Sequence, residues 1–256
     1  ALGRNRVAGD GTRGVDHRIV DLAALAGVSR ALGEAVGVQE FVEQEGEIAA
    51  FDLDDTLWDV TPVLERAEAE LLAWLRSRCP AAVAGHNLQT LRAMRLALVR
   101  AQPTLAHQIT RARQLQLQTL MAQAGLDAGA AAALAQEAMA VFLRARHEVA
   151  LFDAVEDVVA ELHRHYVLGV LTNGNADIYR LPLGRYFTFA YSAEALNSSK
   201  PMPLHFERTL QKTGAAPAEI VHVGDHAEHD IAGAQALGWR TVWFNRHDAP
   251  WPGNTP

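Results

Sequence analysis

The chain has 256 residues, of which 49% are hydrophobic and 21% are charged, a composition typical of a folded globular protein. Its net charge of −7 argues against nucleic acid as a partner, because the nucleic-acid backbone is negative too. No apolar run approaches the ~18 residues that a membrane-spanning helix needs, which argues against a membrane protein.

The single cysteine, Cys79, cannot form an internal disulfide. This fits a reducing compartment, and we expect a cytoplasmic protein in which Cys79 lies at a helix end. The length suits one large domain or a core with a smaller companion. We expect a monomer or a weak homodimer.

Residues 1–45 are predicted to be a peripheral extension, flexible or helical. They contain Gly9, Gly11 and Gly14 in the GxGxxG spacing of a dinucleotide-binding loop. That fingerprint requires a preceding strand, and the eight residues before Gly9, which include two arginines, do not supply one. We therefore do not predict dinucleotide binding.

After this extension, five short apolar runs have the length and β-branched content of buried strands. They lie at residues 48–51, 167–171, 187–193, 220–223 and 241–244. Helix-period stretches separate the later runs, at residues 155–165, 204–213 and 229–237. This alternation predicts an α/β fold with a parallel sheet covered by helices on both faces.

One interval, residues 60–148, breaks the alternation and contains only helix-period sequence. Pro80, Pro103 and the turn around Gly125 divide it into about four helices. An insertion directly after the first strand lies above that strand's carboxyl end, where open α/β sheets bind ligands. We predict a catalytic core of residues 46–59 and 149–256 and a helical cap of residues 60–148. A plain helical subdomain remains the alternative.

Asp52 and Asp54 follow the first predicted strand with one residue between them. Alternate side chains of an extended segment share a face, so both carboxylates can point into one crevice. Two unpaired carboxylates so close would raise one another's pKa, and a Mg²⁺ ion would remove the repulsion. The alternative is a turn or helix cap rich in aspartate.

Further polar residues follow other predicted strands or precede a helix. Hydroxyl and backbone N–H groups after the second strand could hold phosphate oxygens, a lysine could neutralise them, and two aspartates follow the fourth strand. These residues are Thr172, Asn173, Gly174, Lys200, Asp225 and Asp230. Each alone could be an ordinary turn or surface residue, but together they predict a site at the strand ends.

These segments resemble the motifs of the haloacid dehalogenase superfamily of phosphohydrolases. The matching pieces are FDLDDTLWD, LTNGN, Lys200 before a proline, and GDHAEHDIAGA, in the superfamily's order and spacing over residues 47–246. The resemblance implies a Rossmann-like three-layer core, a parallel sheet between two helical layers, with an inserted helical-bundle cap. That architecture agrees with the interval described above.

The resemblance also implies a mechanism. Asp52 would attack phosphorus and form an aspartyl-phosphate, and Asp54 would protonate the leaving oxygen and later activate water. Thr172 and Lys200 would stabilise the transferring phosphoryl oxygens. The dehalogenases of this superfamily lack an acid–base aspartate at the position of Asp54, so its presence favours phosphate esters.

The implied Mg²⁺ site comprises Asp225, a carboxylate oxygen of Asp52 and the backbone carbonyl of Asp54. Asp230 would act from behind, orienting Lys200 or metal-bound water. A zinc site at His226 and His229 is the alternative, although oxygen ligands suit Mg²⁺ better.

The predicted cap carries narrower resemblances. DVTPVLERAE and QPTLAHQITRAR resemble a bacterial branch of capped phosphatases that act on flavin mononucleotide and on 5-amino-6-(5-phospho-D-ribitylamino)uracil, an intermediate of riboflavin biosynthesis. This implies a small phosphorylated metabolite as substrate. Alternatives are a pyrimidine or other nucleotide 5′-phosphatase, a sugar-phosphate phosphatase, a phosphomutase, or a regulator that binds a phosphorylated ligand.

On the same resemblance, His107, Thr110 and Arg113 are candidate substrate contacts on a cap helix. Their spacing of three places them on one helix face. A solvated polar face is the alternative. Trp58 and Arg66 are further candidates, and Trp58 could stack on a flavin or pyrimidine ring or simply pack the hinge of the cap.

Overall fold

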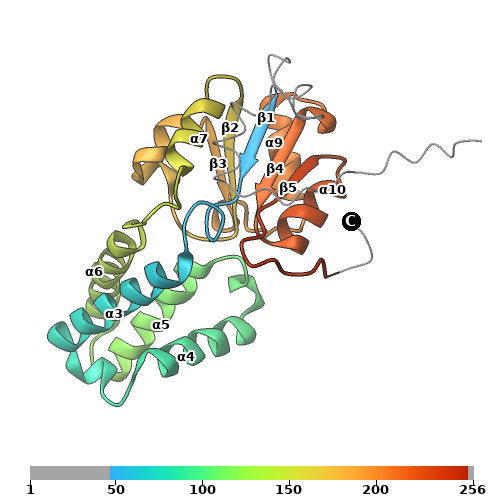
Figure 1. Cartoon of the computed structure of the whole chain (residues 1–256). Helices are drawn as coiled ribbons and strands as arrows, with labels where there is room; N and C mark the ends of the chain where they lie inside the picture. Colours follow the sequence, from blue (N-terminus) through green and yellow to red (C-terminus); the bar gives the residue numbers. More distant parts are fainter. Residues whose placement is uncertain (1–46, 253–256) are drawn as a thin grey trace, which may run out of the picture.

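The computed structural model describes residues 47–252, so the predictions for residues 1–45 lie outside the described part. It contains a parallel five-stranded sheet in the order β3-β2-β1-β4-β5 (Figure 1). The strands are β1 Ile48–Phe51, β2 Val167–Thr172, β3 Phe189–Ser192, β4 Ile220–Gly224 and β5 Arg240–Trp243. All five predicted strands are confirmed, with shifts of one or two residues at their ends.

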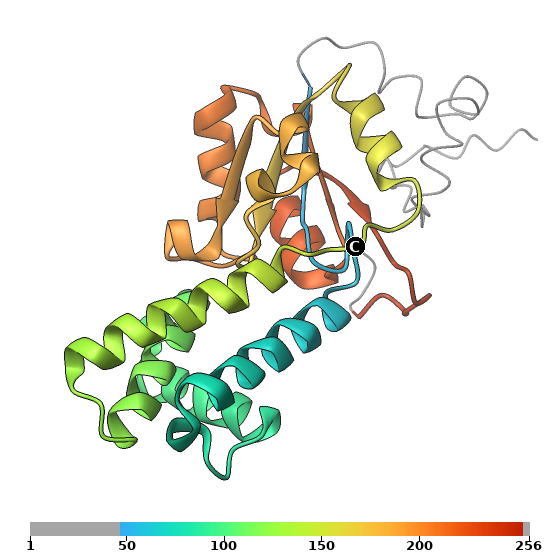
Figure 2. The same cartoon turned by 90° about the vertical axis from the view of Figure 1, so that its left-hand side faces the viewer.

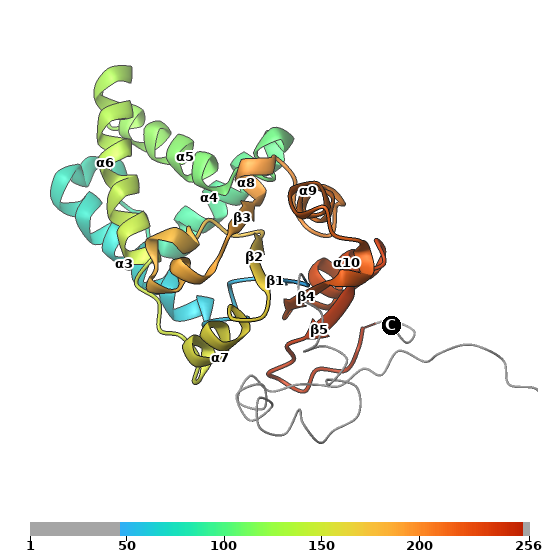
Figure 3. The same ribbon diagram turned by 90° about the horizontal axis from the view of Figure 1, so that it is seen from above.

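Both faces of the sheet are covered, as predicted, because β1 and its neighbours are apolar on both sides. One face packs against α7 (Val155–Leu162), whose Val155 and Val159 belong to the same buried apolar cluster as Phe51 and Leu168. The other face packs against α9 (Leu204–Thr213) and α10 (Gly233–Gln235). Figure 3 shows α7 on one side of the strands and α9 and α10 on the other.

Four long helices separate β1 from α7 and β2: α3 Val60–Arg78, α4 Leu88–Ala101, α5 Ile109–Gln123 and α6 Ala128–Arg146. They have a separate apolar core and lie beyond the end of the sheet toward which β1 points (Figures 1 and 2). We call this bundle the cap. The exact division into core and cap domains stays a prediction.

Local sequence explains where the cap helices begin. Asp59 and Asp127 accept hydrogen bonds from backbone N–H groups in the first turns of α3 and α6, and Asn87 forms a reciprocal capping box with Thr90 at α4. No helix of the described part is long and apolar enough to cross a membrane.

One element differs from its prediction. The helix expected at residues 229–237 is a π-helical segment, Ala227–Ala232, continued by the short α10. His226 begins it: its Nδ1 atom accepts hydrogen bonds from the backbone N–H groups of Glu228 and His229. The wider helical turn follows directly after Asp225, and such turns occur often at functional sites.

Candidate active site

The carboxyl ends of β1, β2 and β4 bring polar residues together. Asp52 directly follows β1, and its backbone N–H continues the strand ladder to Val223 at 2.9 Å. Thr172 ends β2 and Asp225 directly follows β4. The parallel sheet therefore places three predicted site residues at one edge because their strands run in register side by side.

Lys200 joins this group from the loop before α9. Its Nζ atom lies 2.7 Å from Oδ1 of Asp52 and 2.7 Å from Oδ1 of Asp230, and it also donates to the carbonyl of Leu171. Its side chain is only 1% exposed. The ammonium therefore contacts two carboxylates and the backbone of β2, and its role toward a phosphoryl group stays a prediction.

The amide of Asn173 is committed to the same loop. Its Oδ1 accepts from the backbone N–H of Lys200 at 2.8 Å, and its Nδ2 donates to the carbonyl of Lys200 at 2.9 Å. This side chain therefore orients Lys200, and only the backbone N–H of Asn173 remains for the predicted phosphate contact. Thr172 Oγ1 accepts from Gly174 N at 2.9 Å.

Three carboxylates converge beside Lys200. Oxygen atoms of Asp52, Asp225 and Asp230 lie within 4.8 Å of one another. Burial raises the pKa of Asp52 well above its ordinary value, and Lys200 offsets this only in part. Burial, with repulsion from Asp230 and Asp55, raises the pKa of Asp225 to about 7. The site accumulates more negative charge than its one lysine neutralises.

Asp230 behaves differently. Burial alone would raise its pKa, but Lys200 and His222 outweigh burial and hold the pKa of this carboxyl below its usual range. Its Oδ1 faces Lys200 and the ring of His222, and its Oδ2 accepts from the backbone N–H of His226 at 3.0 Å. Both oxygens therefore have protein partners, and the predicted role of Asp230 behind Lys200 stays a prediction.

The cluster fits a hard divalent cation. Its donors are carboxylate oxygens, the ligands that Mg²⁺ prefers, and a cation there would offset the burial and the repulsion that raise the pKa of Asp225. The zinc alternative finds less support. The rings of His226 and His229 stack at 3.7 Å, and neither histidine belongs to the described cluster.

Asp54 lies next to the cluster, but its carboxylate is held by other residues. Trp58 Nε1 donates to Oδ1 at 2.9 Å. Arg146 Nη2 lies 2.7 Å from Oδ1 and 2.6 Å from Oδ2. Trp58 thus contacts the site through its indole N–H. Asp55 accepts a hydrogen bond from Val60 N at 3.0 Å at the start of α3.

Sequence reasoning missed Arg146. It is the last residue of α6 and is 1% exposed. Its residue type is no clear signal of a site, because basic residues in the last turn of a helix are common and stabilise its negative end. Its position immediately before the chain re-enters the core was the one available hint.

The surroundings of residue 174 explain why a glycine follows Thr172 and Asn173. A Cβ atom at this position would lie 2.5 Å from Asp54 Oδ2 and 3.2 Å from Thr172 Oγ1. No side chain fits in that space. The backbone after β2 can therefore approach the carboxylate of Asp54 closely, which a larger residue would prevent.

The predicted cap contacts divide into two groups. His107 precedes α5 rather than lying on it, so the prediction of one shared helix face is wrong for His107. Its Nδ1 lies 2.8 Å from Ser199 Oγ, next to Lys200. Thr110 is on α5 and accepts from Asn175 Nδ2 at 3.2 Å. Both residues therefore contact the loops that build the site.

Arg113 is buried inside the cap. Its guanidinium donates to Oε1 of Glu68 at 3.2 Å and lies 3.7 Å from the ring centre of Phe142. Burial, together with the nearby Arg95, lowers the pKa of Arg113 to about 9. This arrangement does not support a substrate contact. Arg66, in turn, hydrogen-bonds the carbonyls of Ala145 and Glu148 at the end of α6.

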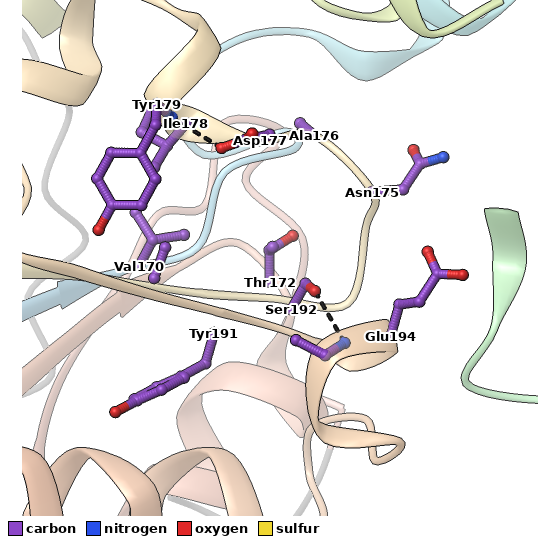
Figure 4. A pocket seen from close by; sticks show the side chains of 12 residues that line it. Val170, Thr172, Asn175, Ala176, Asp177, Ile178, Tyr179, Tyr191, Ser192 and Glu194 are labelled. Carbon is purple, nitrogen blue, oxygen red and sulfur yellow. Dashed lines mark hydrogen bonds between the residues drawn. The ribbon is translucent and has the colours of Figure 1, made fainter. Parts of the chain in front are cut away.

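A pocket of about 280 Å³ opens beside Thr172. Figure 4 shows the rings of Tyr179 and Tyr191 at one end and Asn175 and Glu194 at the other, with Thr172 and Ser192 between them. The pocket combines aromatic surface with hydrogen-bonding groups, as small-molecule sites do.

Comparison with known proteins gives consistent results. The profile of the haloacid dehalogenase-like hydrolase family matches residues 47–238. The Escherichia coli protein YigB, a 5-amino-6-(5-phospho-D-ribitylamino)uracil phosphatase, is 35% identical over 206 residues, covering 80% of this chain and 86% of that protein. The E. coli pyrimidine 5′-nucleotidase YjjG is 31% identical over 91 residues, 33% of this chain and 40% of its own length.

A solved structure described as a 2-haloacid dehalogenase from Pseudomonas syringae pv. Tomato superposes with a TM-score of 0.77 and 39% identity. The match covers 81% of this chain and 90% of the other. It supports the parallel sheet with its helical layers.

Proposed function

This chain belongs to the haloacid dehalogenase-like hydrolases, and we propose that it is a Mg²⁺-dependent phosphomonoesterase that forms an aspartyl-phosphate on Asp52. The observation that carries the proposal is the pairing of two differently held carboxylates. Asp52 contacts the lysine Nζ at 2.7 Å, whereas Asp54 is held by Trp58 and Arg146. Different environments give two nearby carboxylates different tasks.

In the first step, an oxygen of Asp52 attacks phosphorus and the bond to the leaving oxygen breaks with its electron pair. Asp54 gives a proton to that oxygen. In the second step, Asp54 takes a proton from water, whose oxygen attacks the phosphorus. Inorganic phosphate leaves and Asp52 is regenerated. The ammonium of Lys200 and the hydroxyl of Thr172 stabilise the charge on the phosphoryl oxygens throughout.

Asp52, Asp225 and the backbone carbonyl of Asp54 would hold the Mg²⁺ ion. When bound, the ion supplies positive charge to the phosphoryl oxygens. The raised pKa values of Asp52 and Asp225 support this assignment, because they indicate carboxylates that are poorly balanced without a cation.

For the substrate, we propose flavin mononucleotide or 5-amino-6-(5-phospho-D-ribitylamino)uracil, which would place the enzyme in riboflavin biosynthesis. The similarity to YigB supports this choice. So does the pocket beside Thr172, because Tyr179 and Tyr191 offer aromatic surface to a ring and Asn175 and Glu194 offer partners to hydroxyl groups. Pyrimidine nucleotides and sugar phosphates are the alternatives.

A 2-haloacid dehalogenase is a second candidate, because the Pseudomonas structure is so described. Asp54 favours the phosphatase. A halide leaves without a proton, so dehalogenation would not use this held carboxylate as a proton donor to the leaving group.

The test is a panel assay. The purified chain is incubated with p-nitrophenyl phosphate, flavin mononucleotide, the ribitylaminouracil phosphate, pyrimidine nucleotides, sugar phosphates and 2-chloropropionate, with Mg²⁺ or with EDTA. We expect phosphate release that requires Mg²⁺ and is lost in Asp52→Asn. Chloride release without phosphate release would replace the proposal by dehalogenation, and a preference for sugar phosphates would overturn the substrate assignment.

A further inference from the structure

We propose that Arg146 is a positioning residue that fixes the carboxylate of Asp54 for proton transfer to and from the leaving-group oxygen. The inference rests on the proposed function and assigns a cap residue to the acid–base half of the reaction. Arg146 has no part in binding the phosphoryl group, a role that is proposed for Lys200 and Thr172.

The contacts of Asp54 define its orientation. One guanidinium nitrogen of Arg146 lies 2.7 Å and 2.6 Å from the two carboxylate oxygens, and Trp58 Nε1 donates to Oδ1 at 2.9 Å. Gly174 packs against the same pair, because a Cβ atom there would lie 2.5 Å from Asp54 Oδ2 and 3.4 Å from Arg146 Nη2. A carboxylate held from several directions keeps one rotamer, and a proton donor must be aimed to within a fraction of an ångström.

Arg146 is itself fixed. Its side chain is 1% exposed, and its Nε donates to Asn175 Oδ1 at 3.2 Å. Asn175 in turn donates to Thr110 Oγ1 on α5 at 3.2 Å. A chain of hydrogen bonds therefore connects α5 of the cap, the loop after β2, the end of α6 and finally Asp54.

The guanidinium is not satisfied by this network alone. Its Nη1 atom is enclosed and has no hydrogen-bond partner among the described residues. A buried arginine with an unmet donor is costly. If the residue at position 146 served only to hold the cap against the core, an apolar side chain would stabilise that contact as well or better. The cost of burying an arginine with an unmet donor would then be unnecessary. The contact with Asp54 gives the arrangement a use in catalysis.

The placement at the end of α6 adds a coupling to the cap. Arg146 is the last helical residue before the chain returns to the core, and Arg66 of α3 hydrogen-bonds the neighbouring carbonyls of Ala145 and Glu148. Any displacement of α3 and α6 moves the guanidinium relative to Asp54.

The experiment compares substrates with good and poor leaving groups. An aryl phosphate such as p-nitrophenyl phosphate needs little protonation of its leaving oxygen, whereas glycerol 2-phosphate needs a proton. For Arg146→Gln we expect kcat on glycerol 2-phosphate to fall about 10²-fold, within the range of general acid–base effects. The fall on p-nitrophenyl phosphate should be about tenfold smaller. Arg146→Lys should show the same selectivity with a smaller loss.

A double-mutant cycle with Asp54→Asn isolates the coupling. Because Arg146 acts through Asp54, Arg146→Gln should cause no further loss of glycerol 2-phosphate hydrolysis in the Asp54→Asn background. Adding guanidinium at low concentration should partly restore Arg146→Ala and should not restore the Asp54→Asn, Arg146→Ala double variant.

Arg144→Gln is the matched control, since Arg144 lies on the same helix, is exposed and pairs with Glu70 at 3.4 Å; both substrates should be unaffected. Equal losses on both substrates, or additive losses in the cycle, would overturn the role of Arg146 while leaving the phosphatase intact. If Arg146→Gln does not fold, Arg146→Lys and its cycle decide the question. A wild-type chain without phosphatase activity would instead remove the proposed function itself.

Discussion

The amide of Asn173 and the backbone of Lys200 form a closed pair of hydrogen bonds, at 2.8 Å and 2.9 Å. The two residues lie 27 positions apart and come from different loops at the carboxyl edge of the sheet. The pair fixes the loop from which the lysine ammonium reaches Asp52. An asparagine that looked like a ligand contact therefore acts by placing a cation.

The first prediction follows from this pair. Asn173→Ala should lower kcat about 10-fold to 100-fold, because about 1–3 kcal/mol of hydrogen bonding to the Lys200 loop is lost. Steady-state kinetics on p-nitrophenyl phosphate measures the effect. Asn245 is a matched control: its amide makes the same kind of pair with the backbone of Ala249 in the C-terminal loop. An equal loss of activity in Asn245→Ala would contradict the argument.

The second prediction concerns Asp54. Asp54→Asn should leave Mg²⁺ binding largely intact, because only the backbone carbonyl of this residue is assigned to the ion. Turnover of alkyl phosphates should fall about 10²-fold to 10⁴-fold, since the acid–base group is lost. Magnesium-dependent shifts of the melting temperature and phosphate release, measured on one preparation, separate the two effects. Robust turnover in the variant would refute the role.

The third prediction is a pH dependence of metal binding. The fold raises the pKa of Asp225 from an ordinary 3.8 to about 7. Protonation of this carboxyl therefore stabilises the metal-free fold, and this contribution is complete at pH values below 3.8. That stability is lost as the pH rises through about 7. A cation competes with this proton, so stabilisation by Mg²⁺ should grow from about pH 5.5 to about pH 8.

Melting curves with MgCl₂ or EDTA at the two pH values measure this dependence. At about 100-fold excess over Kd, the ion should add about 2–3 kcal/mol. Asp230 affects stability in the opposite direction, because its pKa is depressed. Its contribution to the stability of the fold is lost only as the pH falls below the ordinary pKa range of an aspartate, which lies outside the window of about pH 5.5 to about pH 8. Asp225→Asn should abolish most of the gain, and a gain that is independent of pH would contradict the prediction.

The fourth prediction concerns stability of the cap. Glu68 is 6% exposed and accepts hydrogen bonds from Arg92, Arg95 and Arg113. Glu68→Gln should reduce the free energy of unfolding by about 2–4 kcal/mol, because the buried guanidinium of Arg113 loses its counter-charge. Urea denaturation measures the change.

Glu70→Gln is the control for this change. Glu70 lies on the same helix and, among residues 47–252, pairs through one exposed contact of 3.4 Å with Arg144. We expect an effect within about 0.5 kcal/mol, as for most exposed ion pairs. Similar losses in the two variants would show that the arginine cluster does not stabilise the cap.

The sequence was sufficient for features that depend on neighbouring residues. Apolar runs of four to seven residues predicted the strands, and their periodicity distinguished them from the helices of the cap. Because parallel strands end at one edge of a sheet, the polar residues after them were also predictable as a group. Asp52, Thr172 and Asp225 come together for this reason.

Tertiary structure alone decided which side chains face one another. Arg146 and Asp54 are 92 positions apart, and Lys200 and Asp52 are 148 apart; no local period encodes either contact. The same limit explains why Arg113 suggested a ligand contact but lies against Glu68 and Phe142 inside the cap. Periodicity predicts which face of a helix a residue lies on. The partner of a buried charge depends instead on how separate elements pack, because packing removes the charge from water and thereby requires a counter-charge.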